Sequence, residues 1–387
     1  MKYLVLLCDG MSDYPLDALG GKTPMQTAHK PNMDKLARVS RLGLVKTVDD
    51  GMSPGSDVAN LSILGYDPNV YYSGRSPLEA GSMGIEMEPD DVAVRCNLVT
   101  LSDEAEFSGA TMLSYCADDI RTDEAAGIIT LVNEKLGNER FIFHAGINYR
   151  HCLIWKNGKL NLNLTPPHDI TGMRIGDHLN YNEHNNELLE LMSESYNLLR
   201  GKQANSIWFW GEGKKRELSA FYEKTGKRAA MISAVDLLKG IGKFTGMDVI
   251  NVPGATGYLD TNFAGKRDAA VNALKSGTDL VYLHIEAPDE CGHRGEIEGK
   301  VKAIELIDAL VLGPFLEAFE GEAIRILICP DHATPLSLRT HTNDAVPYLI
   351  YDSAELQKGA EIFTEETAKE AGNYIADGYT LMEKFLC

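Results

Sequence analysis

Six side chains that could bind metal ions follow apolar, strand-length runs of the sequence. Each has an ordinary structural explanation, since aspartate often starts a turn and histidine is often a hydrogen-bonded core or surface group. Three carboxylates packed at one edge of a sheet, beside three imidazoles, would raise one another's pKa, and divalent cations would relieve this repulsion. Zinc, manganese and similar metals bind such a mixture. The six residues are Asp9, Asp289, His293, Asp331, His332 and His341.

Ser56 adds a hydroxyl, in the stretch "SPGSDVANLSILGYDP" at residues 53–68. The local sequence predicts a helix N-cap, because a serine oxygen can accept a hydrogen bond from a free helix amide and apolar residues follow it. We expect this helix to end near Gly65 and Pro68. Metal binding would instead lower the pKa of the Ser56 hydroxyl and make it a nucleophile. Two metals about 3.5–4 Å apart are the usual clamp for phosphoryl transfer, and a helix N-terminus helps to hold a phosphate.

The elements that must position these residues are runs that are apolar at every position. Such runs are typical of strands buried on both faces of a parallel sheet, and helical patterns such as "NMDKLARV" and "SAVDLLKGIGKF" lie between them. The alternation predicts an α/β fold with a doubly wound, mainly parallel sheet, whose ligands gather at the carboxyl ends of the strands. The runs are "YLVLLCDG", "IWFWGEG", "DVINVPGATG", "LVYLHIEAPDE" and "IRILICPDH".

The middle of the chain has a different pattern. Alternating strands are predicted in "DVAVRCNLVTL" and "RFIFHAGINYRHCLIWKNG", and a helix in "NNELLELMSESYNLLRG". We therefore expect a smaller α+β domain, residues 81–200, inserted into a larger domain made of residues 1–80 and 201–387. The crossings fall in "GRSPLEAGSMG" and "GKQANS", which are rich in small or turn-forming residues. A length of 387 residues also exceeds what one core usually serves.

The composition excludes several classes of partner. A net charge of −19 argues against nucleic acid, because binding to a phosphate backbone depends on clustered Lys and Arg. No apolar run approaches the roughly 20 residues that span a bilayer, and "MKYLVLLCDG" is too short for a signal peptide, so no membrane partner is expected. The seven cysteines are odd in number and form no Cys-x-x-Cys pair, which speaks against a disulfide framework. We expect a cytoplasmic protein, and its oligomeric state stays open.

Six motifs in this order resemble one family, the archaeal-type, cofactor-independent phosphoglycerate mutases of the alkaline phosphatase superfamily. "DG" or "PDH" alone would carry no information, whereas their joint occurrence is specific, and the likeness runs nearly from end to end. The motifs are "CDGMSD", "GSDVANLSILGYDP", "GRSPLEAG", "VPGATGYLDTNFAGK", "APDECGH" and "PDHATP".

The resemblance implies a nucleophile and two metal-binding groups. The family's serine nucleophile falls on Ser56. One metal would be bound by Ser56 together with Asp9, Asp331 and His332, and the other by Asp289, His293 and His341. We expect manganese, with zinc, cobalt or magnesium as alternatives, and no requirement for bisphosphoglycerate.

Four further residues are nominated as substrate contacts by the same resemblance. Lys266 would contact the phosphoryl group, whereas Arg150, His168 and Asp169 would hold the glycerate part. An arginine fork suits a carboxylate or phosphate, although an arginine that begins a strand is as often a surface ion-pair partner. Asp169 could move a proton on a substrate hydroxyl or could simply form a turn. For Lys266 the plain alternative is a solvated surface lysine.

The implied activity is an isomerase reaction of glycolysis and gluconeogenesis. 3-Phosphoglycerate and 2-phosphoglycerate would interconvert through a phosphoserine at Ser56, with the larger domain phosphatase-like and metal-binding and the insert acting as a substrate-binding lid. The main alternative is a metal-dependent phosphatase or phosphodiesterase of the same superfamily, which uses the same ligands but releases phosphate to water. A nucleotide-dependent phosphotransferase is disfavoured because no "GxxxxGK[ST]" loop occurs. An intact Ser56 counts mildly against a non-catalytic metal-binding protein.

Overall fold

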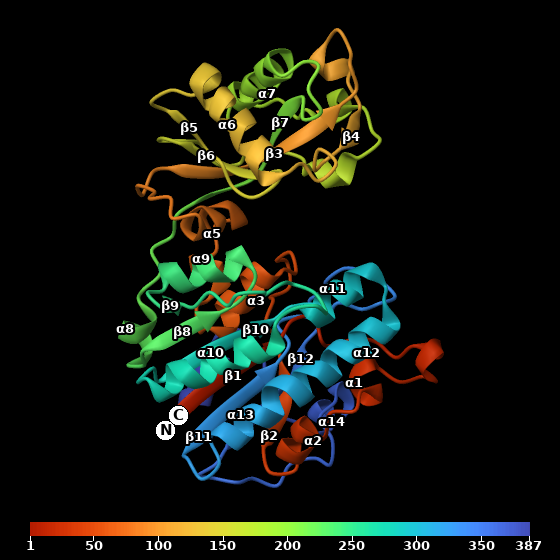
Figure 1. Ribbon diagram of the computed structural model, residues 1–387, viewed down its shortest axis with the longest axis vertical. Coiled ribbons are helices and arrows are strands. Elements are labelled where there is room, and N and C mark those ends of the chain that lie inside the picture. Colours follow the sequence, from red (N-terminus) through yellow and green to blue (C-terminus); the bar gives the residue numbers. More distant parts are fainter. The chain divides into compact units, whose positions relative to one another are not determined.

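The computed structural model describes residues 1–387, and its contacts divide the chain into two compact units (Figure 1). The first unit is discontinuous, Met1–Tyr72 together with Glu217–Cys387, and the second is Ser73–Arg216. The chain thus passes between the units at 72/73 and 216/217, whereas the sequence placed these crossings near residues 80 and 200.

The first unit is built on an 8-stranded sheet of order β13-β2-β12-β11-β1-β10-β8-β9. β1 is central, and its residues from Tyr3 to Cys8 are all buried, as in a strand covered on both faces. Only β12 runs antiparallel to its neighbours, so the predicted mainly parallel α/β sheet is confirmed. The strands are β1 (Lys2–Cys8), β2 (Arg41–Val45), β8 (Ala229–Ile232), β9 (Asp248–Val249), β10 (Leu280–Ile285), β11 (Ile324–Cys329), β12 (Val346–Asp352) and β13 (Tyr374–Ile375).

Helices cover both faces of this sheet, which makes it doubly wound. Leu4 and Leu6 share a core with Leu274 of α10, and α10, α12 and α13 lie in front of the sheet in Figure 1. Tyr3 faces the opposite side, where its ring meets that of Phe385 in α15 edge-on at 5.7 Å. The helices are α1 (Pro24–Thr27), α2 (Pro31–Ala37), α3 (Ser56–Ile63), α4 (Pro68–Tyr71), α8 (Phe221–Thr225), α9 (Asp236–Phe244), α10 (Phe263–Lys275), α11 (Ala287–Arg294), α12 (Ile297–Leu306), α13 (Gly313–Ala318), α14 (Glu365–Glu370) and α15 (Leu381–Leu386), with a π-helical turn at Ile307–Leu312.

The second unit has an antiparallel 5-stranded sheet, as expected of an α+β domain. β3 is central, paired with β6 on one side and β7 on the other, and β5 lies outside β6. Ile129 of α6 and Leu188 of α7 pack into its core with Trp208 of β7. The elements are α5 (Arg75–Ser82), β3 (Val92–Leu101), β4 (Met112–Ser114), α6 (Thr122–Leu136), β5 (Phe141–His144), β6 (Arg150–Trp155), α7 (Asn186–Leu198) and β7 (Ser206–Lys214).

Three segments differ from the sequence-based interpretation. "IWFWGEG" was expected in the parallel sheet but forms β7 of the antiparallel sheet. Its run of buried residues is covered on both faces there, just as it would be in a parallel sheet, so the apolar run does not distinguish the two. "DVINVPGATG" is a strand only at Asp248–Val249. "GRSPLEAGSMG" contains helix α5 rather than a turn-rich crossing. No helix of either unit is both long and apolar enough to cross a membrane.

Candidate metal and nucleophile site

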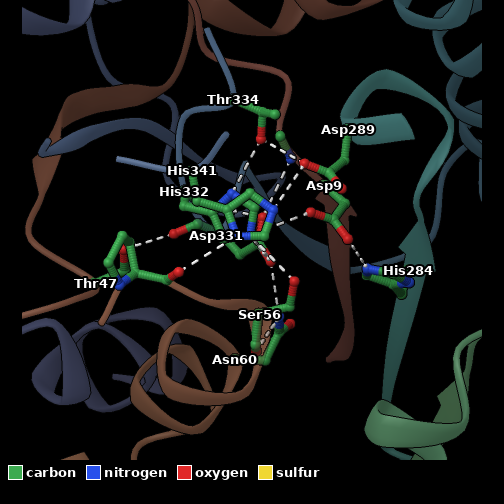
Figure 2. A network of polar contacts seen from close by, with 12 residues as sticks. Asp9, Thr47, Ser56, Asn60, His284, Asp289, Asp331, His332, Thr334 and His341 are labelled. Carbon is green, nitrogen blue, oxygen red and sulfur yellow. Dashed lines mark hydrogen bonds and ion pairs between the residues drawn. The ribbon is translucent and has the colours of Figure 1, made fainter. Parts of the chain in front are cut away.

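Asp9, Asp331 and His332 form a buried group at the carboxyl ends of two adjacent strands, and we call it group A (Figure 2). β1 and β11 run parallel with Leu7 opposite Cys329, so the residues that follow them emerge at the same edge of the sheet. One potential ligand atom from each of the three lies within 4.8 Å of the others. The three residues are at most 1% exposed.

Asp289, His293 and His341 form a second such group, group B. Asp289 and His293 lie one turn apart on α11, which puts both on one face of the helix. The Nε2 atom of His293 lies 3.3 Å from Asp289 Oδ2, and that of His341 lies 3.4 Å from Asp289 Oδ1. The ring of His341 also stacks on that of His332 at 3.8 Å, so groups A and B adjoin each other.

The carboxylates of the two groups have unusual protonation and bonding. Burial raises the pKa of Asp9 well above its usual range, and the neighbouring carboxylates of Asp331 and Asp289 raise it further. Asp9 Oδ1 is buried with no hydrogen-bond partner. Burial opposes ionisation of Asp289 as well, but hydrogen bonds from His293 and His341 hold its pKa well below the usual range. A divalent cation would give Asp9 Oδ1 a partner and balance the negative charge of group A, so group A fits a metal ion. Group B fits one by its donor set, a carboxylate and two imidazoles.

Ser56 is the first residue of α3, and the N-cap is Gly55. The predicted capping role of Ser56 is therefore wrong. Its Oγ atom instead lies 3.1 Å from Nε2 of His332, at the edge of group A (Figure 2). The hydroxyl is thus next to a candidate metal ligand, and α3 starts without a side-chain cap on its free amides.

Asn60, which the sequence analysis missed, connects the serine helix to group A. Its amide nitrogen donates to the Ser56 carbonyl at 2.8 Å and to Asp331 Oδ2 at 2.9 Å. Its Oδ1 accepts the hydroxyl proton of Tyr282 at 2.5 Å. All three polar contacts are inside the unit, so this amide fixes the position of Ser56 relative to Asp331.

His284 and Lys266 form the other side of the site. His284 Nε2 contacts Asp9 Oδ2 at 2.8 Å, and its Nδ1 lies 3.1 Å from the Ser233 hydroxyl. Lys266 donates from Nζ to the His284 carbonyl at 3.2 Å. Burial lowers the pKa of Lys266 to about 8, and nearby Glu286 and Asp9 oppose this, so the amine stays largely protonated at neutral pH. Lys266 is fully buried, which rules out the surface alternative.

Arg150, His168 and Asp169 lie in the second unit, where a chain of aromatic rings joins them. The Arg150 guanidinium lies 4.6 Å above the ring of Tyr149, which meets the ring of Tyr115 edge-on at 5.9 Å. Tyr115 in turn meets His168 at 6.1 Å, and His168 Nε2 is 3.6 Å from Asp169 Oδ1. His168 and Asp169 are therefore neighbours, and two tyrosine rings connect them to Arg150.

Arg95 and Trp210 extend this chain of rings, and the sequence analysis missed both. Trp210 packs edge-on against His168 at 5.1 Å, and the Arg95 guanidinium lies 4.2 Å above the Trp210 ring. Burial lowers the pKa of Arg95 to about 10, although its partner Glu79 at 3.0 Å acts in the opposite direction. Arg95 was overlooked because it lies within the apolar run of β3.

A serine beside two Asp/His groups, at the carboxyl edge of a mainly parallel α/β sheet, is typical of metal-dependent enzymes of phosphoryl transfer. The family model for 2,3-bisphosphoglycerate-independent phosphoglycerate mutase matches residues 37–205. The chain belongs to the 2,3-bisphosphoglycerate-independent phosphoglycerate mutase family. It is 49% identical to a probable member from Geobacter sulfurreducens, with all of both chains covered. It is also 49% identical to a member from Methanosarcina barkeri, over 96% of this chain and 95% of the relative.

Solved structures agree with this fold. A Pyrococcus horikoshii protein matches with a TM-score of 0.82 and 27% identity, over 100% of this chain and 96% of that one. The cofactor-independent phosphoglycerate mutase from Thermoplasma acidophilum matches with a TM-score of 0.66 and 23% identity, over 100% of this chain and 99% of that one. The second likeness speaks for the fold alone.

Proposed function

We propose that this chain interconverts 3-phosphoglycerate and 2-phosphoglycerate through a phosphoserine on Ser56, as an isomerase of glycolysis and gluconeogenesis. Ser56 Oγ would lose its proton and form a bond to phosphorus as the bond between phosphorus and the C3 oxygen breaks, and the C3 oxygen would take up a proton. The glycerate would stay bound and reorient. Its C2 hydroxyl would then lose its proton and bond to phosphorus, and Ser56 Oγ would leave as a hydroxyl again. Bisphosphoglycerate has no part in this sequence of steps.

The observation that carries the proposal is the Ser56 hydroxyl at 3.1 Å from His332, beside group A. Group A together with Ser56 would hold one metal, and group B the other. Bound metals would lower the pKa of the Ser56 hydroxyl and oppose the charge of the phosphate oxygens. Three carboxylates and three imidazoles favour manganese, with zinc as the next choice. The protonated Lys266 would add a fixed positive charge near the phosphate.

The second unit, Ser73–Arg216, is proposed as the substrate-binding lid, and Met1–Tyr72 with Glu217–Cys387 as the metal-binding, phosphatase-like domain. Arg150 has a planar fork that fits a carboxylate. Asp169, beside His168, is a proton acceptor for a glycerate hydroxyl. The lid would exclude water, since hydrolysis of the phosphoserine would turn the mutase into a phosphatase.

The cysteines and the net charge bear on the cellular compartment and the binding partners of the protein. The seven cysteines are all free, which agrees with the reducing conditions of the cytoplasm. The net charge of −19 opposes binding to nucleic acid. We therefore propose a cytoplasmic enzyme whose partner is the small-molecule substrate.

The proposal is tested with the full-length, Mn²⁺-loaded protein, 3-phosphoglycerate and enolase, which reports the 2-phosphoglycerate formed. The Ser56→Ala variant should lose at least about 10³-fold of the activity, because no other group replaces a missing nucleophile. The matched control is Ser53→Ala, an exposed serine in the same loop, which should keep wild-type activity. Full activity of Ser56→Ala without added bisphosphoglycerate would refute the mechanism, and free phosphate without 2-phosphoglycerate would identify a phosphatase.

The role of the second unit has its own test. Arg150→Leu should abolish mutase turnover while a slow release of free phosphate persists, because the serine and the metal groups are unchanged. Arg121→Leu removes a guanidinium that pairs only with exposed Asp123 in the same unit, and should be neutral. An Arg150→Leu variant with normal turnover would remove Arg150 from the substrate site.

A further inference from the structure

Thr334 lies between groups A and B and contacts a residue of each (Figure 2). Its hydroxyl forms a short hydrogen bond with Asp289 Oδ1 of group B. The same Oγ1 lies 3.3 Å from Nδ1 of His332 in group A. Thr334 itself is fully buried, so water does not compete for these contacts. The threonine hydroxyl makes no hydrogen bond to a third group.

The direction of the two hydrogen bonds follows from the chemistry of the three groups. A carboxylate oxygen accepts the hydrogen bond, and Thr334 Oγ1 is the donor to Asp289 Oδ1. The single proton of the Thr334 hydroxyl is therefore donated to Asp289. The contact with His332 then requires that Nδ1–H of the imidazole donates to Thr334 Oγ1. A neutral imidazole with its proton on Nδ1 has a lone pair on Nε2.

That lone pair points toward the reacting groups. Nε2 of His332 lies 3.1 Å from Ser56 Oγ, 3.4 Å from Asp331 Oδ2 and 3.7 Å from Asp9 Oδ1. Nε2 is thus the atom that group A would present to a metal, and a metal ligand must have its lone pair free.

The backbone holds Thr334 firmly in this place. Lys300 donates from Nζ to the Thr334 carbonyl at 2.7 Å, and the Thr334 amide donates to the Ser12 carbonyl at 3.3 Å. Two glycines leave room for the threonine. A Cβ atom on Gly10 would lie 2.6 Å from Thr334 Oγ1, and one on Gly292 would lie 2.7 Å from the Thr334 carbonyl oxygen.

We propose that Thr334 is a positioning residue which sets the Nδ1–H tautomer of His332 and the orientation of Asp289 through one hydroxyl group. A single side chain thereby prepares both groups for metal binding. This inference rests on the proposed metal site, but the tautomer of His332 can be observed without any metal.

The test uses the full-length protein in three measurements. The first is the ring ¹⁵N NMR spectrum of the chain labelled in its ten histidines, prepared without metal, with the His332 signal assigned by its loss in a His332→Asn variant. The second is a calorimetric titration with Mn²⁺. The third is mutase activity.

The variants are Thr334→Val, which replaces the hydroxyl by a methyl group, and Thr334→Ser, which keeps the hydroxyl. The control is Thr245→Val, an equally buried threonine whose hydroxyl bonds the Ile241 carbonyl, away from both groups.

We expect the Nδ1–H tautomer of His332 in the wild type and in Thr334→Ser, and its loss in Thr334→Val. Outer hydrogen bonds of this kind change metal affinity about 10–100-fold, so Thr334→Val should bind Mn²⁺ about 10–100-fold more weakly than wild type. The Mn²⁺ affinities of Thr334→Ser and Thr245→Val should stay within a few-fold of wild type.

An Nε2–H tautomer of His332 in the wild type would overturn the proposal, even if Thr334→Val did not fold. Unchanged Mn²⁺ affinity of a folded Thr334→Val would overturn it as well. If the wild type bound no Mn²⁺, the proposed metal site would be wrong, and the tautomer alone would decide the role of Thr334.

Discussion

The buried lysine Lys300 gives the sharpest prediction about stability. Its Nζ donates to Asp13 Oδ2 at 2.6 Å, to the Thr334 carbonyl at 2.7 Å and to the Ser12 carbonyl at 3.3 Å. Neither the Lys300 nor the Asp13 side chain is exposed. Lys300 lies on α12, so one ammonium ties this helix to the loops that follow β1 and β11. We predict that Lys300→Met, which keeps the length of the side chain and removes the charge, loosens these loops.

The size of the stability loss follows from the Asp13 carboxylate, which the Lys300→Met substitution leaves buried without its cation. Asp13 would keep hydrogen bonds from the amides of Tyr14 and Leu336, but its carboxylate would be buried without a cation. Breaking a buried ion pair in this way costs about 3–5 kcal/mol, a large part of the roughly 5–15 kcal/mol by which a domain is stable. The double variant Lys300→Met/Asp13→Asn has no unpaired charge, so its loss of stability should be smaller than the sum of the two single losses by about 1–3 kcal/mol.

The assay is urea unfolding in the presence of a chelator, because a bound metal would add its own stabilisation. All three tryptophans, Trp155, Trp208 and Trp210, lie in the second unit. Tryptophan fluorescence therefore follows that unit, whereas far-ultraviolet circular dichroism follows both. We expect Lys300→Met to shift the circular dichroism transition of the first unit and to leave the fluorescence transition in place. A loss below about 1 kcal/mol, or an equal shift of both signals, would refute the reasoning.

Three further predictions concern pH, metal and backbone. Burial lowers the pKa of His151 from 6.5 to about 4. As the pH falls, His151 of the unfolded chain is therefore protonated before His151 of the folded chain. The free energy of unfolding should keep its full His151 contribution above pH 6.5 and fall by about 3 kcal/mol between pH 6.5 and pH 4. His151→Gln should lack this part of the slope in urea unfolding followed by tryptophan fluorescence, and identical slopes would contradict the assignment. Removing metal with a chelator should lower the melting temperature of the wild type. Mn²⁺ at a concentration of 100 times its Kd should restore about 2.7 kcal/mol of unfolding free energy. Identical calorimetric unfolding curves with and without the chelator would speak against a resident ion. Gly10 has a φ of +60° and no room for a Cβ, so Gly10→Ala should cost at least about 1–2 kcal/mol in urea unfolding followed by circular dichroism. Gly20→Ala, in the same unit with a φ of +65° and open space, shows the effect of backbone strain alone.

The sequence predicted the parts of this protein in which a local pattern has one physical meaning. The apolar runs of β1, β10 and β11 are buried on both faces because they are central in a parallel sheet, and the residues that follow such strands meet at one edge. That is why Asp9, Asp289 and Asp331 were predicted to lie together. The same logic failed for "IWFWGEG", because an antiparallel strand packed on both sides gives the same apolar run as a parallel one.

Other features depend on contacts that no short stretch reveals. Ser56 has the residue type and setting of an N-cap, but the chain turns one residue earlier, at Gly55. Asn60 and Thr334 are ordinary polar residues within the motifs, and each contacts a carboxylate more than 40 residues away in the chain. Arg95 is hidden in an apolar strand, where its partner Glu79 and the ring of Trp210 compensate the burial of its charge. Such roles become visible only when distant segments are placed side by side.

The discontinuous first unit has a consequence for the order of events during synthesis. The central strand β1 is made first, but its neighbours β10 and β11 begin at Leu280 and Ile324. The second unit is one continuous segment, Ser73–Arg216, so it can complete its core while the ribosome is still translating the rest of the first unit. During that interval β1 has apolar residues on both faces and no partner strand. The newly made N-terminal segment is therefore the part of the chain with the greatest need of a chaperone, and the inserted unit is the part with the least.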